Sequence, residues 1–307
     1  MLRIVLARFG SAALVVLGVS TLVFMLIHLI PGDPVEVMLG ESAQPADREA
    51  LRHALGLDLP VLQQWWSYML RLAHFDFGIS LYSKQPVANV LLERLPATAQ
   101  LAAAGLVTGI VIAVPLGIIA ALRRGTAWDR GAMGFALIGI SIPHFWSGPL
   151  LILFFSVWLG WLPVSGKENA ASLILPALTL GTALAAILSR MLRATLLEVL
   201  SEEYIRTARA KGLSERVVIF QHALRNALLP IVTLLGLQLG ALLGGAVITE
   251  TVFSWPGLGQ LTIEAIQKRD YPVLQACVLL ISVTYVLVNT LTDFVYSVLD
   301  PRVRLSG

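Results

Sequence analysis

Residues 99–122 read AQLAAAGLVTGIVIAVPLGIIAAL, a run of 24 residues without a charged side chain. A helix of about 20 apolar residues is long enough to cross the roughly 30 Å hydrocarbon core of a bilayer. Five further stretches have similar length and few or no charges, namely Phe9–Ile30, Gly131–Leu153, Ser172–Met191, Ala227–Thr249 and Pro272–Thr292. The sequence therefore predicts an all-α polytopic membrane protein with six transmembrane helices.

The composition of the whole chain agrees with this prediction. Of the 307 residues, 57% are hydrophobic and only 13% are charged, whereas a soluble domain usually carries about a quarter charged residues. The mean hydropathy of +0.79 implies more apolar surface than one globular core could bury, so lipid must solvate much of it. The single cysteine, Cys277, excludes a disulfide framework and provides no zinc-binding spacing.

The third predicted helix differs from the others because prolines interrupt it. We expect Pro143 and Pro149 to kink it. Trp158 and Trp161 follow at the end of the same uncharged region, and they suit an exit through the membrane interface.

The distribution of basic residues predicts the orientation. If the N-terminus is inside the cell, the inner segments are residues 1–8, 123–130, 190–226 and 293–307, with 14 basic and 7 acidic side chains. The outer segments then carry 8 basic and 12 acidic side chains. Because inner segments are enriched in Lys and Arg, both termini are predicted to be cytoplasmic. The sequence pI of about 9.2 reflects this orientation and requires no nucleic-acid partner.

These boundaries divide the chain into four parts. They are an N-terminal transmembrane helix (1–30), an external amphipathic segment (31–96), a five-helix transmembrane domain (97–299) and a cytoplasmic tail (300–307).

The external segment contains signals for two short helices. Pro31-Gly32-Asp33-Pro34 is expected to end the first transmembrane helix. Asp47–Leu55 and Leu62–Leu72 have amphipathic helical spacing. Trp65, Trp66 and Tyr68 suit a membrane interface. Two interpretations remain open: a helical cap that lies on the outer surface, and a docking or gating surface for a partner that delivers substrate.

The inner loop from about residue 195 to residue 229 contains the signals of a helix of about three turns. Ser201 is a suitable N-cap, and Gly212 suits the left-handed position beyond the last turn. Acidic side chains occupy the first turn and basic ones the last, which suits the helix dipole: Glu202 and Glu203, then Arg209 and Lys211.

Two further features of this loop bear on its role. Glu202 and Arg206 have the favourable i,i+4 order of a helical ion pair. Ser214 is expected to start a second, basic helix that Pro230 closes as the fifth transmembrane helix begins. A helix pair of this kind is either a solvated loop or a docking surface for another protein, and its defined ends favour docking.

The central motif of this loop runs from Tyr204 to Gly212 and reads Tyr-Ile-Arg-Thr-Ala-Arg-Ala-Lys-Gly, followed by His222-Ala223-Leu224-Arg225-Asn226-Ala227 and Leu229-Pro230. It resembles the inner loop that the permeases of binding-protein-dependent ABC importers present to their ATPase subunits, in the dipeptide/oligopeptide/nickel branch of that family. Arg206-Thr207-Ala208 stands where the broader family has Glu-Ala-Ala, and this departure matches the branch.

Other segments along nearly the whole chain are similar to the same branch, and their combination is highly specific. They are Leu29–Pro34, Leu55–Pro60, Asp76–Ser80, Trp161–Pro163, Glu250–Gly259, Arg269–Pro272 and Asp300–Arg302.

The resemblance implies a type I ABC importer permease fold and a set of partners. These partners are a second, similar permease, two ABC ATPase subunits that bind ATP and Mg²⁺, and an external solute-binding protein. It also implies an ATPase-coupling role for the inner loop, whose candidate residues are Glu203, Tyr204, Arg206, Thr207, Ala208, Arg209, Ala210, Lys211 and Gly212.

The sequence contains no motif for covalent chemistry of its own. It lacks G-x-x-x-x-G-K-[ST], so no phosphate-binding loop for ATP is expected. It also lacks H-E-x-x-H and G-x-S-x-G, the signatures of common hydrolases. The five histidines have no metal-ligand spacing. We therefore expect no enzyme activity, no cofactor and no metal in this chain.

Polar side chains within the apolar stretches are candidates for the translocation path. Gln238 and Asn289 must face other helices or a wet cavity, because an amide that faces lipid loses its hydrogen bonds. Glu250 lies at the end of the fifth stretch and either caps the interface or lines the path. Arg190 and Arg193 are expected to extend toward the inner interface.

Alternatives remain for the solute and for the class of transporter. Short peptides are expected, with glutathione or a nickel chelate as alternatives, because this branch carries all three. A secondary transporter is the alternative of another class, but it would need coupling-ion carboxylates near the midplane, and none is evident. The predicted location is the bacterial cytoplasmic (inner) membrane.

Overall fold

The computed structural model describes residues 2–29, 35, 44–54 and 56–299. The regular secondary structure of these residues is helical, apart from one isolated bridge between Ile79 and Pro86. The predicted stop at residues 31–34 and the predicted tail at residues 300–307 lie outside the described residues.

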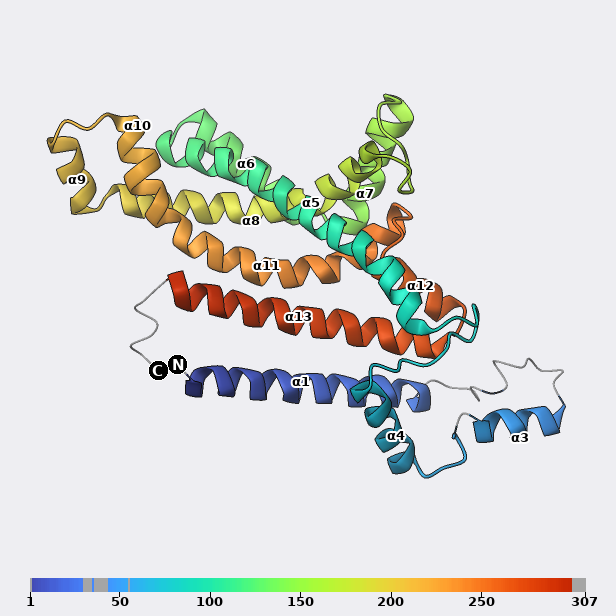
Figure 1. Ribbon diagram of the computed structural model, residues 1–307. Coiled ribbons are helices and arrows are strands. Elements are labelled where there is room, and N and C mark those ends of the chain that lie inside the picture. Colours follow the sequence, from blue (N-terminus) through green and yellow to red (C-terminus); the bar gives the residue numbers. More distant parts are fainter. Residues whose placement is uncertain (1, 30–34, 36–43, 55, 300–307) are drawn as a thin grey trace. The chain divides into compact units, whose positions relative to one another are not determined.

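Long helices dominate the described chain (Figure 1). They are α1 (Leu2–Leu29), α5 (Val87–Leu122), α8 (Ile174–Leu200), α11 (Leu224–Val252) and α13 (Tyr271–Leu299). The shorter α-helices are α3 (Pro45–Ala54), α4 (Val61–Ala73), α6 (Ala127–Ser141), α7 (His144–Leu151), α9 (Glu203–Ala210), α10 (Glu215–Val217) and α12 (Leu258–Gln267). Two π-helices, η1 (Ile152–Trp158) and η3 (Val218–Ala223), and a 3₁₀ turn, η2 (Ala170–Leu173), complete the set. Helices α3 and α4 confirm the two short helices predicted in the external segment.

Several helices match the predicted transmembrane segments. Among the described residues, four helices are long and apolar enough to cross a bilayer, and they are Val87–Leu122, Ala170–Leu200, Glu215–Gly240 and Tyr271–Thr292. The bent pair α6–α7 is a fifth if it counts as one span, and α1 contains the shorter apolar stretch Gly10–Met25. The described residues of every predicted segment are thus helical, apart from the break at Ile142 and Pro143, while the count of six spans stays a prediction.

The predicted spanning stretch Ala99–Leu122 lies wholly within α5, which begins twelve residues earlier at Val87. The charged pair Glu93 and Arg94 ends the apolar run in sequence. A helix can nevertheless continue through polar residues once it leaves the hydrocarbon core, so hydropathy marks the membrane boundary better than the helix boundary.

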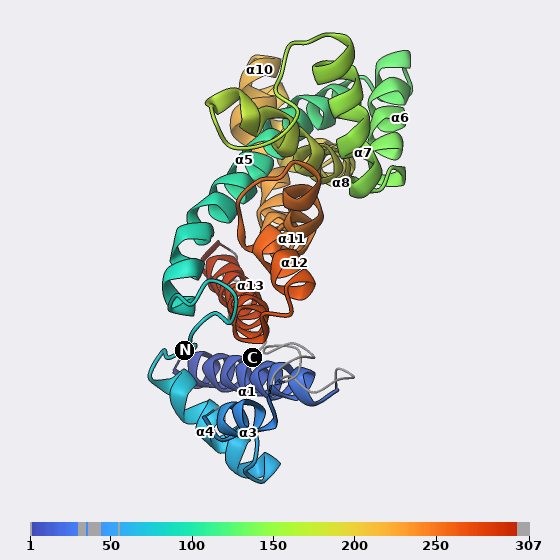
Figure 2. The same ribbon diagram turned by 90° about the vertical axis from the view of Figure 1, so that its right-hand side faces the viewer.

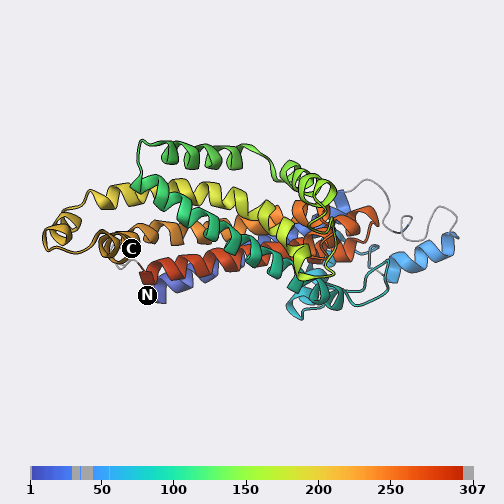
Figure 3. The ribbon, with the colours of Figure 1, turned by 90° about the horizontal axis from the view of Figure 1, so that it is seen from above.

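The predicted bend in the third helix is confirmed at Pro143, whereas Pro149 lies inside α7. Ala127–Ser141 and Phe145–Trp158 meet at an angle of 112°. Figure 3 shows α6 beside α8, and α7 leaves the direction of α6 beyond the bend. Ile142 has a ψ of 117°. The residue before a proline is disfavoured in the α region, so Pro143 ends α6 and fixes the bend.

The chain forms two compact units. The first contains residues 1–96 and 257–286, and the second contains residues 97–256 and 287–307. The first unit has a small apolar core in which the start of α5 packs on α12 and on the first turns of α13, through Val87, Leu91, Leu261 and Cys277 among others. Gln275 of α13 donates a hydrogen bond to the Val23 carbonyl of α1 at 2.9 Å.

Two of the segments that resemble the importer branch meet in the first unit. The carboxylate of Asp270 is buried and accepts hydrogen bonds from the Ser80 hydroxyl, from the Leu81 amide at 3.1 Å and from the Tyr82 amide at 3.3 Å. Asp270 precedes α13, and residues 80–82 precede α5. One side chain therefore joins loops that lie 190 residues apart in the sequence.

Helix α8 lies within the second unit among α5, α6, α7 and α11. Three glycines of α5 lie directly against leucines of α8, namely Gly105, Gly109 and Gly117. A Cβ atom at each of these glycines would come within about 3 Å of a leucine side chain. Their partners are Leu180, Leu184 and Leu192, in the same order along the chain. The constant offset shows that α5 and α8 run in parallel, as the predicted topology requires.

Candidate functional site

Helix α9 lies beyond the end of α8 and is shorter than predicted (Figure 1). It contains eight residues, about two turns rather than three. Ser201 does not cap it, because the Ser201 hydroxyl donates to the Glu198 carbonyl at 2.6 Å and so ends α8. Glu202, with extended backbone angles of −69° and 147°, precedes α9 instead.

Gly212 ends this helix as predicted. Its φ is +80°, in the left-handed region that favours glycine. Its amide donates to the Arg209 carbonyl at 2.9 Å. A Cβ atom at this position would meet nothing within 4 Å. The requirement for glycine therefore comes from the backbone conformation and not from crowding.

One face of α9 is packed against η3, the segment that leads without a break into α11. Ile205 is fully buried and Ala208 nearly so, in the same apolar cluster as Val218, Ala223 and Ala227. Ile205 was not among the residues predicted to act in coupling, although its i,i+3 spacing to Ala208 is the signal of a buried face.

Polar contacts strengthen this attachment. The Asn226 side-chain amide of α11 donates to the Tyr204 hydroxyl at 2.7 Å. Arg209 pairs with Glu215 through two nitrogen–oxygen contacts of 2.7 and 3.3 Å, across the turn at Gly212. Such bidentate pairs hold two groups in a fixed geometry.

The predicted ion pair between Glu202 and Arg206 is wrong, because Arg206 has a different acidic partner. Arg206 instead contacts Glu203 at 2.8 Å, because Glu202 precedes the helix and lacks helical geometry. The pair is exposed at both ends, so it contributes little stability. The exposed face of α9 comprises Glu203, Arg206, Thr207 and Ala210, and Lys211 extends it just beyond the helix; among the described residues no other element covers this face.

The predicted second helix of the inner loop is not a separate element. It starts after Ser214 as predicted, but α10, η3 and α11 follow one another without a break. Pro230 lies inside α11 and does not close a preceding helix. The π-helical segment η3 carries the buried residues Val218 and Ala223 that hold α9. The inner loop is therefore one short helix attached to the end of one long helix.

An ion pair near the same end of α8 was not predicted. Arg193 contacts both carboxylate oxygens of Asp129, at 2.6 and 2.8 Å, and does not extend alone to the interface. The Gly125 amide adds a third contact to Asp129 at 2.9 Å. Asp129 lies in the first turn of α6 and is almost fully buried. The pair therefore fixes α6 to α8 two turns before α8 leads into α9.

The three path candidates do not form one cluster. Glu250 is fully buried at the end of α11 that is remote from α9, and the Thr98 hydroxyl donates to it at 2.6 Å. Gln238 is half-buried, twelve residues or roughly 18 Å earlier on α11. Asn289 is half-buried on α13, and its side-chain oxygen is buried without a hydrogen-bond partner among the residues that the structure describes.

Two of these candidates lie near one helix contact. Gly236 of α11 lies directly against the Thr292 side chain of α13, and these residues are two and three positions from Gln238 and Asn289. The assignment of all three candidates to a path stays a prediction. Among the described residues, no three His, Cys, Asp or Glu side chains come together to hold a metal ion.

Comparisons with known protein families and sequences give consistent matches along the chain. Residues 113–305 match the family of binding-protein-dependent transport system inner membrane components, and residues 1–102 match the N-terminal family of the same components. The chain is 43% identical to the dipeptide transport system permease protein DppB of Escherichia coli, over 99% of both chains. It is 44% identical to the glutathione transport system permease protein GsiC of Escherichia coli, again over 99% of both.

Solved structures agree at the level of the fold. A chain of the MetNI methionine ABC transporter in an inward-facing conformation matches with a TM-score of 0.60 and 22% identity, over 70% of this chain and 98% of that chain. An amino acid ABC transporter solved with histidines matches with a TM-score of 0.53 and 15% identity, over 70% and 94% of the two chains. The fold is that of type I ABC importer permeases.

Proposed function

The chain belongs to the family of binding-protein-dependent transport system inner membrane components, and on that basis we propose that it forms half of the translocation pathway of an ATP-driven importer of short peptides. The proposal rests on the geometry of α9. It is a short helix with one face packed on η3 and bonded to α11 through Asn226, and with an opposite face that is exposed and charged. This is the geometry needed to receive a movement from another protein and pass it to the membrane helices.

In this mechanism the free face of α9 fits a cleft on an ABC ATPase subunit. ATP and Mg²⁺ bind between the ATPase subunits and not to this chain, which has no catalytic site of its own. When the ATPases close, they push α9. The Ile205 contact and the Tyr204–Asn226 hydrogen bond transmit the push to α11. The direct connection through Ser201 and Glu202 transmits it to α8, and Asp129–Arg193 carries it on to α6.

The complete importer would contain four further proteins. They are a second permease similar to this chain, two ATPase subunits and an external solute-binding protein. The chain would lie in the bacterial cytoplasmic membrane with both termini inside. The excess of basic residues in the predicted inner segments, which include α9, supports this orientation.

Short peptides are the proposed substrates, and glutathione is the second candidate. The relatives that are named for dipeptides and for glutathione have nearly equal identity to this chain. Glutathione is itself a tripeptide with an unusual first linkage, so one pathway could serve both.

A growth and uptake experiment tests the substrate class. Deletion of this gene should prevent growth on dipeptides as the sole source of a required amino acid, and it should abolish uptake of a labelled dipeptide. A parallel measurement with labelled glutathione separates the two candidates. Unchanged dipeptide uptake together with loss of glutathione uptake, or with loss of nickel-dependent urease activity, would reject dipeptides as the substrate.

A further inference from the structure

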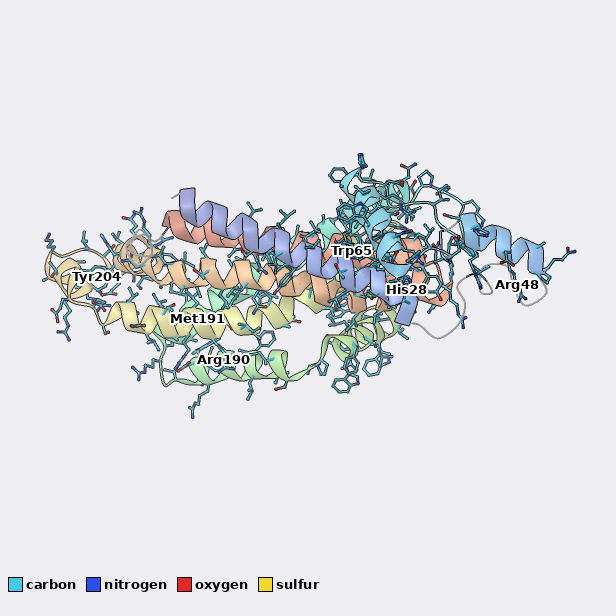
Figure 4. All side chains as sticks on the ribbon, turned by 90° about the horizontal axis from the view of Figure 1, so that it is seen from below. His28, Arg48, Trp65, Arg190, Met191 and Tyr204 are labelled. Atoms are coloured by element: carbon cyan, nitrogen blue, oxygen red, sulfur yellow. The ribbon has the colours of Figure 1, made fainter. Side chains whose placement is uncertain are left out.

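Helix α4 carries two separate apolar stripes, and only one of them is packed. Figure 2 shows α4 beside α1, and the packed stripe makes its contacts with α1. The Trp65 indole donates to the Thr21 hydroxyl at 3.2 Å, and the Tyr68 ring lies 5.6 Å from the Phe24 ring. Figure 4 labels Trp65 near α1, together with His28, which contacts Gln64 of α4 at 3.2 Å.

The second apolar stripe is exposed. Leu62, Trp66 and Leu70 follow one another at i, i+4 and i+8, the spacing of one helix face. Their exposed fractions are 75%, 60% and 47%. The described residues of the first unit leave this stripe uncovered.

The polar residues of α4 form a third stripe. Gln63, Ser67 and Arg71 are also spaced at i, i+4 and i+8, and all three are exposed. At 100° per residue, the centre of this stripe lies roughly 100° round the helix from Leu62, Trp66 and Leu70. The three stripes of α4 thus suit three different environments: protein, water and an apolar medium.

The contacts of α4 fix its level along α1. Helix α4 contacts Thr21, Phe24 and His28, which lie in the last turns of α1. The apolar stretch of α1 is Gly10–Met25. Leu14 and Leu17, earlier along α1, and Leu22, between these contacts, are exposed, which is expected of a helix surrounded by lipid. Helix α4 therefore lies where the apolar part of α1 ends, which is the level of a membrane interface.

We propose that Leu62, Trp66 and Leu70 insert into the outer leaflet at the boundary between headgroups and acyl chains, so that α4 is an in-plane helix that holds the external segment on the lipid surface. Tryptophan is enriched at this depth because its ring is apolar and its N–H is polar. A helix of this type buries its apolar face in the boundary region and leaves its polar face in water. The inference concerns lipid contact and is independent of the solute that the importer carries.

The experiment compares positions on the exposed apolar stripe with matched positions on the polar stripe of the same helix. Leu62→Cys and Leu70→Cys are the test variants, and Gln63→Cys and Ser67→Cys are the controls, each in a Cys277→Ala background. The full transporter complex is reconstituted in proteoliposomes, and a nitroxide label is attached at each position. Collision rates are measured with oxygen, which concentrates in lipid, and with a water-soluble nickel chelate.

Labels at 62 and 70 should give a several-fold higher ratio of oxygen to nickel collision rates than labels at 63 and 67. Equal ratios at all four positions would show that the exposed apolar stripe faces water and would overturn the proposal. Protection of positions 62 and 70 from both reagents only after addition of the solute-binding protein would also overturn it, because the stripe would then bind that protein and not lipid.

Discussion

Gly212 shows how one residue limits the shape of the inner loop. Its φ of +80° costs a residue with a Cβ atom roughly 1–2 kcal/mol. Gly212→Val should leave membrane insertion intact, because the site is exposed and open. It should reduce retention of the ATPase during purification and abolish uptake, because the turn that orients α9 changes.

Gly125 provides the control for this prediction. It has a φ of +79°, no atom within 4 Å of its ideal Cβ position, and a place in the other predicted inner loop. Gly125→Val therefore introduces the same backbone strain away from α9 and should retain more ATPase than Gly212→Val. Equal loss in the two variants would argue that strain, and not the position of α9, is responsible.

The ion pair between Asp129 and Arg193 allows a second prediction. Arg193→Gln leaves a buried carboxylate without its partner, which usually costs about 3–5 kcal/mol. The variant complex should therefore unfold at a lower temperature in detergent. The double variant Asp129→Asn/Arg193→Gln removes both charges and should recover much of this loss. A double variant as unstable as the sum of the two single variants would contradict a direct pair.

Single residues differ in how far the sequence predicts them. The role of Gly212 follows from its neighbours in the chain, because a helix and its C-terminal turn are local structures. The partner of Arg193 does not, because Asp129 lies 64 positions away. Several carboxylates of the inner segments could have met this arginine, and only the packing of α6 on α8 selects one.

At the scale of elements, the ends of α9 show the same limit. Serine is a common N-cap residue, but it can also end a helix when its hydroxyl donates a hydrogen bond to an earlier carbonyl, as Ser201 does to Glu198. Pro230 lies in the interior of α11 and does not start it. A proline costs a helix one backbone hydrogen bond, and long membrane helices tolerate that loss when neighbouring helices hold the chain.

Arg209 was predicted either to contact the ATPase or to balance the helix dipole, and its pair with Glu215 offers a third role. If the pair fixes the turn at Gly212, then Arg209→Ala and Glu215→Ala should reduce uptake to a similar extent, and the double variant should be no worse than either single variant. Uptake in proteoliposomes measures all three. A much larger loss with Arg209→Ala than with Glu215→Ala would instead favour direct contact between Arg209 and the ATPase.

At the scale of the whole molecule, periodicity and charge predict the helices and their direction. The parallel packing of α5 and α8 agrees with the predicted topology. The grouping of residues 257–286 with residues 1–96 was not predicted, because it depends on contacts such as Asp270 with residues 80–82 that have no local pattern. Similarity to a family indicated that both segments matter, and the structure shows that they bind each other.

Contact between α9 and an ATPase subunit can be detected by site-specific cross-linking. Ala210→Cys lies on the exposed face of α9, and Arg124→Cys is an exposed control in the other inner loop. Each variant, in a Cys277→Ala background, is labelled with a thiol-reactive photo-cross-linker in membranes that contain the complete importer. A cross-link from position 210 to the ATPase that changes in yield with ATP is expected, together with a much weaker one from position 124. No cross-link from position 210, in an importer that still takes up its substrate, would show that α9 does not contact the ATPase.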